Sequence, residues 1–417
     1  MSSFISPEKR RWFIVAIIFV ITVFSYVDRQ VVSILKPILK EEFSLDDAGY
    51  ALIINVFTIC YAVMYPISGW LVDKFGARKI MFWGVLTWSF SSIGSGLART
   101  LFPFAIFRSL LGLAEPTTYP AQIKVVTKWF SGKLRATANS ISVAGGTIGS
   151  VIAPPFIAWL VLTFTWHSAF IIPGIVGIVV ALVWFFLYKE PPKGYVKDTV
   201  SGDSVSENSP AFSWGKLWTR KSLWGIVLIR FITDPVWYFI LFWLPGFLME
   251  ESGLSLSQLG MVGWIPFLAA SLGGIASSAW SDWMVRRGKP ALRSRKVMLS
   301  YVAFLAPVIL LPDSWGVAVT IIKFSVLAAV ALSWIYTESV LIAETFPINN
   351  VASVLGIAGG FGAAGAVIFN YLIGHFMTSV GTGWIFMVMA VLHPLTLFIL
   401  WKMIRPEIPK ETAIAKQ

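Results

Sequence analysis

Long apolar stretches recur along the whole chain, and they constrain its fold more than any other feature. A stretch of roughly 20 apolar residues crosses a bilayer as a helix, because a helix satisfies its own backbone hydrogen bonds where there is no water. We predict an all-α membrane protein with twelve transmembrane helices, since twelve such stretches are present and 57% of the residues are hydrophobic. The predicted spans are residues 12–35, 48–72, 80–98, 102–126, 136–160, 169–188, 223–248, 256–280, 297–311, 315–343, 351–376 and 384–403.

The polar segments between these spans predict the domain organisation. A long segment rich in Ser, Pro and charge separates six spans from six, so we expect an N-terminal six-helix bundle (1–188), a cytoplasmic linker (189–221) and a C-terminal six-helix bundle with a short tail (222–417). Lys and Arg are concentrated before the first span, after the even-numbered spans, in the linker and in the tail. Because basic loops stay in the cytoplasm, both termini are predicted to be cytoplasmic.

Composition excludes several other classes of protein. The net charge of +12 lies in the short loops and not in a patch on a folded domain, so no nucleic-acid partner is expected. A single cysteine, Cys60, rules out a disulfide within the chain, and three scattered histidines suggest no metal site. The first apolar stretch is too long for a cleaved signal peptide and is expected to remain as a span.

Charged side chains inside two predicted spans point to transport. Arg108 and Glu115 lie seven residues apart in the fourth span, and Asp28 and Arg29 lie at the end of the first. Ionisable groups in lipid are costly and usually face a cavity. In one continuous helix, seven residues are two turns, so Arg108 and Glu115 would point the same way. Asp28 and Arg29 are adjacent and point about 100° apart, so each needs a partner elsewhere.

An internal repeat relates the two halves. GWLVDKFGARK, which contains Asp73, Arg78 and Lys79, stands between spans two and three, and SAWSDWMVRRG, which contains Asp282, stands at the corresponding place between spans eight and nine. Parallel repeats of six spans are one of the known plans of secondary transporters.

These motifs resemble those of a known family. GWLVDKFGARK is similar to the signature loop of the major facilitator superfamily. FSYVDRQVVSI, FRSLLGLAEPTTYPA and KWFSGKLRATANS resemble the anion:cation symporters within it, and LIRFITDPVWYFILFWLPGFL and GSVIAPPF resemble bacterial hexuronate transporters. The resemblance implies the major facilitator fold, a bacterial inner membrane and proton coupling.

The resemblance also suggests roles for the charges of the first half. Arg108 keeps its proton and its planar fork matches a carboxylate, so it is the expected substrate ligand, with Arg29 as a second. Asp28 and Glu115 match acids of the proton-coupled members, and a carboxylate balanced between burial and a nearby arginine can exchange a proton. The alternative is a set of permanent ion pairs that never titrate.

Other candidate residues are spread over both halves. Arg230 and Asp234, four apart, are expected to neutralise each other, while Glu338 is a lone acid and Lys323 an unpaired charge without an assigned role. Aromatic or amide side chains suited to a sugar predict three pocket residues, and the resemblance implies an inner gate. The pocket candidates are Tyr61, Trp237 and Asn370, and the gate candidates are Asp73, Arg78, Lys79 and Asp282.

The sequence therefore predicts a transporter and not an enzyme. We expect a monomer that imports a small organic anion, a hexuronate first of all, with protons as the coupling ion and no other cofactor. An inside-negative membrane opposes anion entry by about 2.3 kcal/mol per charge per 100 mV, and a co-transported proton cancels that cost. The alternatives are another carboxylate (an aldonate, tartrate or a phthalate-type acid), a facilitator without protons, and a sensor that binds without transporting.

Overall fold

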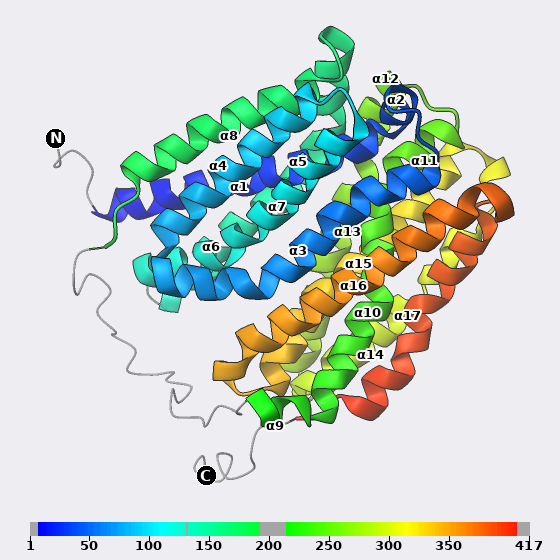
Figure 1. Cartoon of the computed structure of the whole chain (residues 1–417). Coiled ribbons are helices and arrows are strands. Elements are labelled where there is room, and N and C mark those ends of the chain that lie inside the picture. The colour runs from blue at the N-terminus through cyan, green and yellow to red at the C-terminus, as the bar shows by residue number, and fades with distance from the viewer. Residues whose placement is uncertain (1–6, 131, 192–213, 407–417) are drawn as a thin grey trace, which may run out of the picture. The chain divides into compact units, whose positions relative to one another are not determined.

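Residues 7–130, 132–191 and 214–406 are described by the computed structural model of the chain, and in these ranges the regular structure is entirely helical (Figure 1). The first half contains the helices α1 (Pro7–Ile34), α2 (Lys36–Glu42), α3 (Asp47–Phe75), α4 (Ala77–Leu97), α5 (Leu101–Ala114), α6 (Thr118–Trp129), α7 (Gly132–Thr163) and α8 (Ser168–Leu187). The second half contains α9 (Trp214–Trp218), α10 (Lys221–Phe242), α11 (Leu244–Glu250), α12 (Leu256–Val262), α13 (Ile265–Arg286), α14 (Ala291–Ala303), α15 (Val317–Thr345), α16 (Ile348–Val380) and α17 (Gly383–Met403).

All twelve predicted spans are helical in the structure. Nine helices or helix pairs of the described ranges are long and apolar enough to cross a membrane by themselves. The helices of the other three spans are each too short or not apolar enough by themselves, for local reasons. Serines and glycines lower the mean hydropathy of α4, and the spans that begin with α5 and α14 are each divided by a short 3-10 turn, at Glu115–Thr117 and Ala306–Leu310. The prediction of twelve transmembrane helices is confirmed.

The helix that carries Arg108 is not continuous, and the sequence-based prediction was wrong on this point. α5 ends at Ala114, and Glu115, Pro116 and Thr117 form a 3-10 turn before α6 begins. Proline has no backbone N–H, so the regular hydrogen-bond ladder cannot pass through Pro116. Glu115 itself keeps helical dihedral angles (φ −58°, ψ −43°), and its N–H donates to the carbonyl of Leu111, so it still lies two turns after Arg108 and the interruption follows it.

The chain divides into two compact units. The first comprises Met1–Ser204 together with Leu241–Trp264, and the second comprises Val205–Ile240 and Ile265–Gln417. Thus α11 and α12, which belong to the second half of the sequence, pack with the first unit, where α12 contacts α7 and α11 contacts α1 and α2. Most of the predicted linker, residues 192–213, lies outside the described residues, and α9 and α10 follow it.

Close helix packing holds the functional helices of the first unit. α1 runs along α7, and α4 runs along α8 (Figure 1). A Cβ added at Gly149 of α7 would overlap the carbonyl oxygen of Val23 on α1, so only glycine permits this approach. In the signature loop Gly76 adopts a φ of +87° between α3 and α4, a conformation that other residues rarely adopt.

Candidate functional site

An ion pair inside the first unit joins the two charged segments that the sequence singled out. Arg29 on α1 donates to Glu115 in the 3-10 turn, with 2.5 Å between Nε and Oε2. Glu115 is buried, while the side chain of Arg29 is 14% exposed. The second carboxylate oxygen of Glu115, Oε1, has no hydrogen-bond partner among the described residues. Glu115 thus keeps capacity to accept one more hydrogen bond or a proton.

Asp28, the neighbour of Arg29, points to a different helix. Its Oδ1 lies 3.1 Å from the hydroxyl of Ser92 on α4, and its Oδ2 has no hydrogen-bond partner in the described ranges. The same hydroxyl lies 2.9 Å from the carbonyl oxygen of Phe170. A hydroxyl has one hydrogen and a carbonyl can only accept. When Ser92 donates to Phe170, its contact with Asp28 therefore needs a hydrogen supplied by Asp28.

Arg108 is buried in α5, with 1% of its surface exposed. Its guanidinium lies over the ring of Phe57 on α3, 5.0 Å from the centroid, and it is attracted by the charges of Glu115 and Asp28. Neither Nε nor Nη1 has a hydrogen-bond partner in the part of the chain that the structure describes. A buried cation with two open donors is costly unless an anion or water completes it.

Aromatic rings surround Arg29. Its guanidinium lies 4.7 Å from the ring centroid of Tyr61 and 5.1 Å from that of Tyr26. Tyr61 in turn packs on Phe57 and Tyr65. The structure therefore groups one predicted pocket residue, Tyr61, with the four charges predicted to bind substrate or protons in the first unit. The other two, Trp237 on α10 and Asn370 on α16, belong to the second unit, where Asn370 is fully buried and Trp237 packs edge-on against Phe267.

The charges of the second unit form a cluster of their own. Arg230 and Asp234 make the predicted pair within α10, with 3.0 Å between Nε and Oδ2. Glu338 on α15 is not a lone acid as expected, because its Oε2 lies 3.5 Å from Nη1 of Arg230. Lys323 is not unpaired either: its Nζ lies 2.7 Å from Oδ1 of Asp313 and donates to the carbonyl of Leu311. A neighbouring helix supplies the partner of Glu338, and the segment just before α15 supplies the partners of Lys323, so helix periodicity could not reveal either.

The repeated loops also carry ion pairs. Asp73 accepts from Lys124 of α6 at 2.8 Å, and Lys124 also donates to the carbonyl of Val72. At the equivalent place in the second unit Asp282 pairs with Arg295, which also contacts Glu344.

The two basic residues of the first loop lie differently. Arg78 donates to the carbonyl of Phe185 near the end of α8, and Lys79 is exposed. In both units, then, the acid of the repeated loop pairs with a base on a helix of its own bundle.

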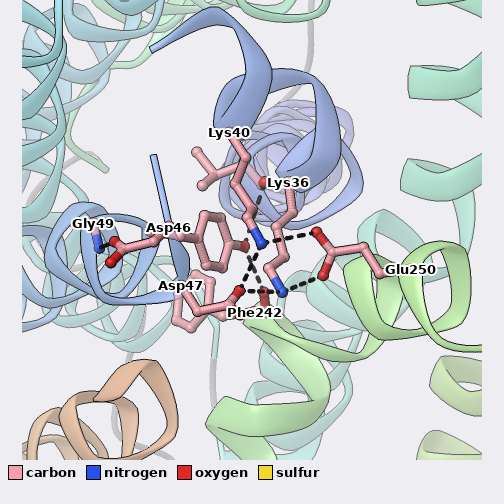
Figure 2. A network of polar contacts seen from close by, with 9 residues as sticks. Lys36, Lys40, Asp46, Asp47, Gly49, Phe242 and Glu250 are labelled. Atoms are coloured by element: carbon pink, nitrogen blue, oxygen red, sulfur yellow. Dashed lines mark hydrogen bonds and ion pairs between the residues drawn. The ribbon is translucent and has the colours of Figure 1, made fainter. Parts of the chain in front are cut away.

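The first unit also contains a four-residue ion network that the sequence pattern did not predict (Figure 2). In this network, which we call the Lys36 network, Lys36 contacts Asp47 at 2.9 Å and Glu250 at 2.5 Å. Lys40 contacts the same two acids at 3.0 and 3.5 Å. Burial lowers the pKa of Lys40, but its hydrogen bonds to Asp47 and Glu250 outweigh burial and leave the pKa raised. The network joins α2 and α3 to α11.

Aromatic packing encloses the Lys36 network. Lys36 is fully buried, with Nζ 5.0 Å from the ring centroid of Trp243 and 5.4 Å from that of Tyr50. The Tyr50 hydroxyl donates to the carbonyl of Phe242 at 2.6 Å. A signal did exist in the sequence: Lys36 and Lys40 lie in the first loop on the predicted outer side, where lysines are depleted. A lysine in a loop where lysines are normally depleted indicates that it binds a specific acidic partner.

Comparisons with known proteins agree with this architecture. Residues 18–337 match the family model described as Major Facilitator Superfamily. The chain is 28% identical over 411 residues to the hexuronate transporter of Escherichia coli K12, covering 95% of this chain and 94% of that protein. It is 29% identical over 274 residues to the galacturonate transporter of Dickeya chrysanthemi, covering 64% of this chain and 79% of that protein.

A solved structure shares the fold. The crystal structure of a bacterial homologue of the human lysosomal transporter Spinster superposes with a TM-score of 0.71 at 20% sequence identity. The match covers 94% of this chain and 95% of that one.

Proposed function

Because this chain belongs to the Major Facilitator Superfamily, a family of transporters and not of enzymes, we propose that it imports a sugar acid together with protons by alternating access. Hexuronates are the proposed substrate class, in keeping with the names of the hexuronate and galacturonate transporters to which the chain is similar. The proposed setting is the inner membrane of a bacterium, with both termini in the cytoplasm and the protein acting as a monomer. No cofactor other than the coupling proton is proposed.

The open guanidinium of Arg108 is the observation that carries this proposal. The Nε and Nη1 donors are buried and lack a hydrogen-bond partner among the described residues, so an incoming carboxylate would satisfy both at once. Glucuronate and galacturonate each carry one carboxylate on a sugar ring. The rings of Tyr61 and Tyr26, beside Arg29, offer apolar faces for the sugar's C–H groups and hydroxyls for its own hydroxyls.

Proton coupling is supported by the two acids beside the arginines. Asp28 and Glu115 each have one buried oxygen without a hydrogen-bond partner in the described ranges, which leaves a place for a proton on each. The double contact of the Ser92 hydroxyl favours a hydrogen on Asp28. One proton per sugar acid removes the electrical cost of anion entry, and a second would draw on the membrane potential.

The experiment is uptake of radiolabelled glucuronate and galacturonate into proteoliposomes, with and without an inward proton gradient. Wild type is compared with Glu115→Gln and with Glu42→Gln, a matched change at an exposed residue of α2. We expect gradient-driven accumulation in wild type and Glu42→Gln, and a loss of at least tenfold in Glu115→Gln with exchange of substrate retained.

The possible failures have distinct meanings. Uptake that ignores the gradient in wild type would leave a carrier but refute proton coupling. Absence of uptake for both sugars would refute the hexuronate class, and binding without uptake would instead identify a sensor.

A further inference from the structure

A cluster in the second unit holds two buried acids but only one base among the residues described. Asp234 and Glu338 are both 3% exposed, and both contact the single guanidinium of Arg230. With both acids ionised the cluster would carry a net charge of −1. An uncompensated charge in a protein interior within a membrane is strongly unfavourable, so the cluster needs a further positive charge or a proton.

The contacts indicate which acid is short of a partner. Asp234 is the closer to Arg230, at 3.0 Å from Nε, and the two residues are one helical turn apart. Glu338 lies 3.5 Å from Nη1, and neither of its oxygens has a hydrogen-bond partner in the described part of the chain. Among the described residues, Asp234 is the acid that repels it. Glu338 therefore forms the weaker ion pair with Arg230.

The other charged groups on the helices around Glu338 are engaged elsewhere. On α15, Lys323 pairs with Asp313, and Glu344 pairs with Arg295, which also holds Asp282 of α13. His393 of α17 is buried with its ring 5.5 Å from that of Trp334, one turn before Glu338, and His375 of α16 is exposed and bonded to the carbonyl of Tyr371. No second cation lies within 4 Å of either acid among the residues described.

The space beside Asp234 is too restricted for a hydrated ion. A Cβ added at Gly362 of α16 would overlap Oδ2 of Asp234, and one at Gly365 would overlap the carbonyl of Phe231. The α16 backbone therefore lies directly against this part of α10. A proton needs no coordination shell, whereas a metal cation would need several oxygen ligands around it. Arg230, with its side chain 18% exposed, is the most accessible member of the cluster.

We propose that Arg230, Asp234 and Glu338 form a second proton-binding site, in which Glu338 holds a proton while Asp234 pairs with Arg230. This site is separate from the one at Asp28 and Glu115 in the first unit. A role for this site in transport rests on the proposed proton-coupled function. The presence of the proton on Glu338 does not rest on it, because the proton is bound whether or not substrate is present.

The test is infrared spectroscopy of the purified full-length protein at neutral pH, which detects the C=O stretch of a protonated carboxyl group. Wild type is compared with Glu338→Gln, Asp234→Asn and Glu344→Gln, a matched change on the same helix outside the cluster. A component of this band should be lost in Glu338→Gln and kept in Glu344→Gln, while the component from a protonated Asp28 remains in every variant. The Glu338-dependent component should also be lost in Asp234→Asn, because removing the surplus acid lets Glu338 ionise against Arg230.

Three results would overturn the proposal. The first is a wild-type spectrum without a band that depends on Glu338. The second is a Glu338-dependent component that persists in Asp234→Asn, since burial alone and not charge balance would then hold the proton. The third is a band that appears only in His393→Asn, which would make His393 the compensating cation. No substrate is added, so a failure of hexuronate uptake leaves this test intact.

Discussion

The charged cluster of the first unit and that of the second differ in charge balance and in the groups they leave open. In the first, two acids face two arginines, and both donors on Arg108 and acceptors on Asp28 and Glu115 lack hydrogen-bond partners in the described ranges. In the second, two acids share Arg230, and three carboxylate oxygens of Asp234 and Glu338 are left open. The first cluster is therefore suited to an anion with a proton, and the second to a proton alone.

Removing the central arginine of the second cluster should have the largest effect on stability. Arg230→Gln leaves two buried acids without a cation, and breaking a buried ion pair costs about 3–5 kcal/mol. We expect unfolding by SDS titration to shift by that order at alkaline pH and by less at acidic pH, where both acids take up protons. Glu338→Gln serves as the comparison, because it leaves a neutral Arg230–Asp234 pair. Equal losses in the two variants would contradict the charge count.

In the first cluster the corresponding change should act on binding. Arg108→Gln should weaken glucuronate binding about 100-fold or more, as measured by isothermal titration calorimetry, because the carboxylate loses its bidentate partner. Arg108→Lys keeps the charge but not the fork, and we expect an intermediate loss. A larger loss of binding in Arg230→Gln than in Arg108→Gln would reverse the assignment of the two clusters.

The packing of α16 against Asp234 can be tested with two glycines of one helix. Gly362→Ala places a methyl group on the oxygen of Asp234 that pairs with Arg230, whereas nothing lies within 4 Å of a Cβ at Gly356. Overpacking typically costs about 1–3 kcal/mol. Thermal unfolding should therefore occur at a lower temperature in Gly362→Ala and remain unchanged in Gly356→Ala. Similar behaviour of the two variants would mean that α16 does not press on the cluster.

The Lys36 network gives a balanced cluster for comparison, since two lysines face two acids. Glu250→Gln should destabilise the protein by roughly 1–3 kcal/mol, because a hydrogen bond to a charged group is lost and Lys36 remains buried. The adjacent, exposed Glu251→Gln should be neutral. The labelling rate of a cysteine introduced into α11 should rise in Glu250→Gln and not in Glu251→Gln. Unchanged labelling would show that the network does not hold this helix.

The smallest effect concerns pH. The folded-state pKa of Lys40 is raised above its ordinary value of 10.5, so its contribution is complete below that value and is lost as pH rises through the folded-state pKa. Stability should therefore be flat around neutral pH for this group, with a small decrease above about pH 10.5 that Lys40→Met abolishes. If stability already decreased near neutral pH, the decrease would have to come from the titration of a group other than Lys40.

The amino-acid sequence by itself determined the fold class and the positions of the membrane spans. Hydrophobicity acts locally, so the segments that enter the bilayer, their helical conformation and the repeat at Asp73 and Asp282 follow from the sequence within a few residues. The charged residues inside the predicted spans could also be identified from the sequence, because an ionisable side chain stands out in an apolar stretch. Even the Arg230–Asp234 pair follows from helix geometry alone.

Only the tertiary structure decided which charge meets which. Arg29 and Glu115 are 86 residues apart, and Lys36 and Glu250 are 214 apart, so their contacts depend on how whole helices pack. The 3-10 turn at Pro116 interrupted the predicted fourth span just after Glu115, and close packing brought Glu338 to Arg230. A buried ion pair depends on ångström-scale distances between helices, whereas membrane insertion depends on the sum of many side chains, and only that sum can be calculated from the sequence.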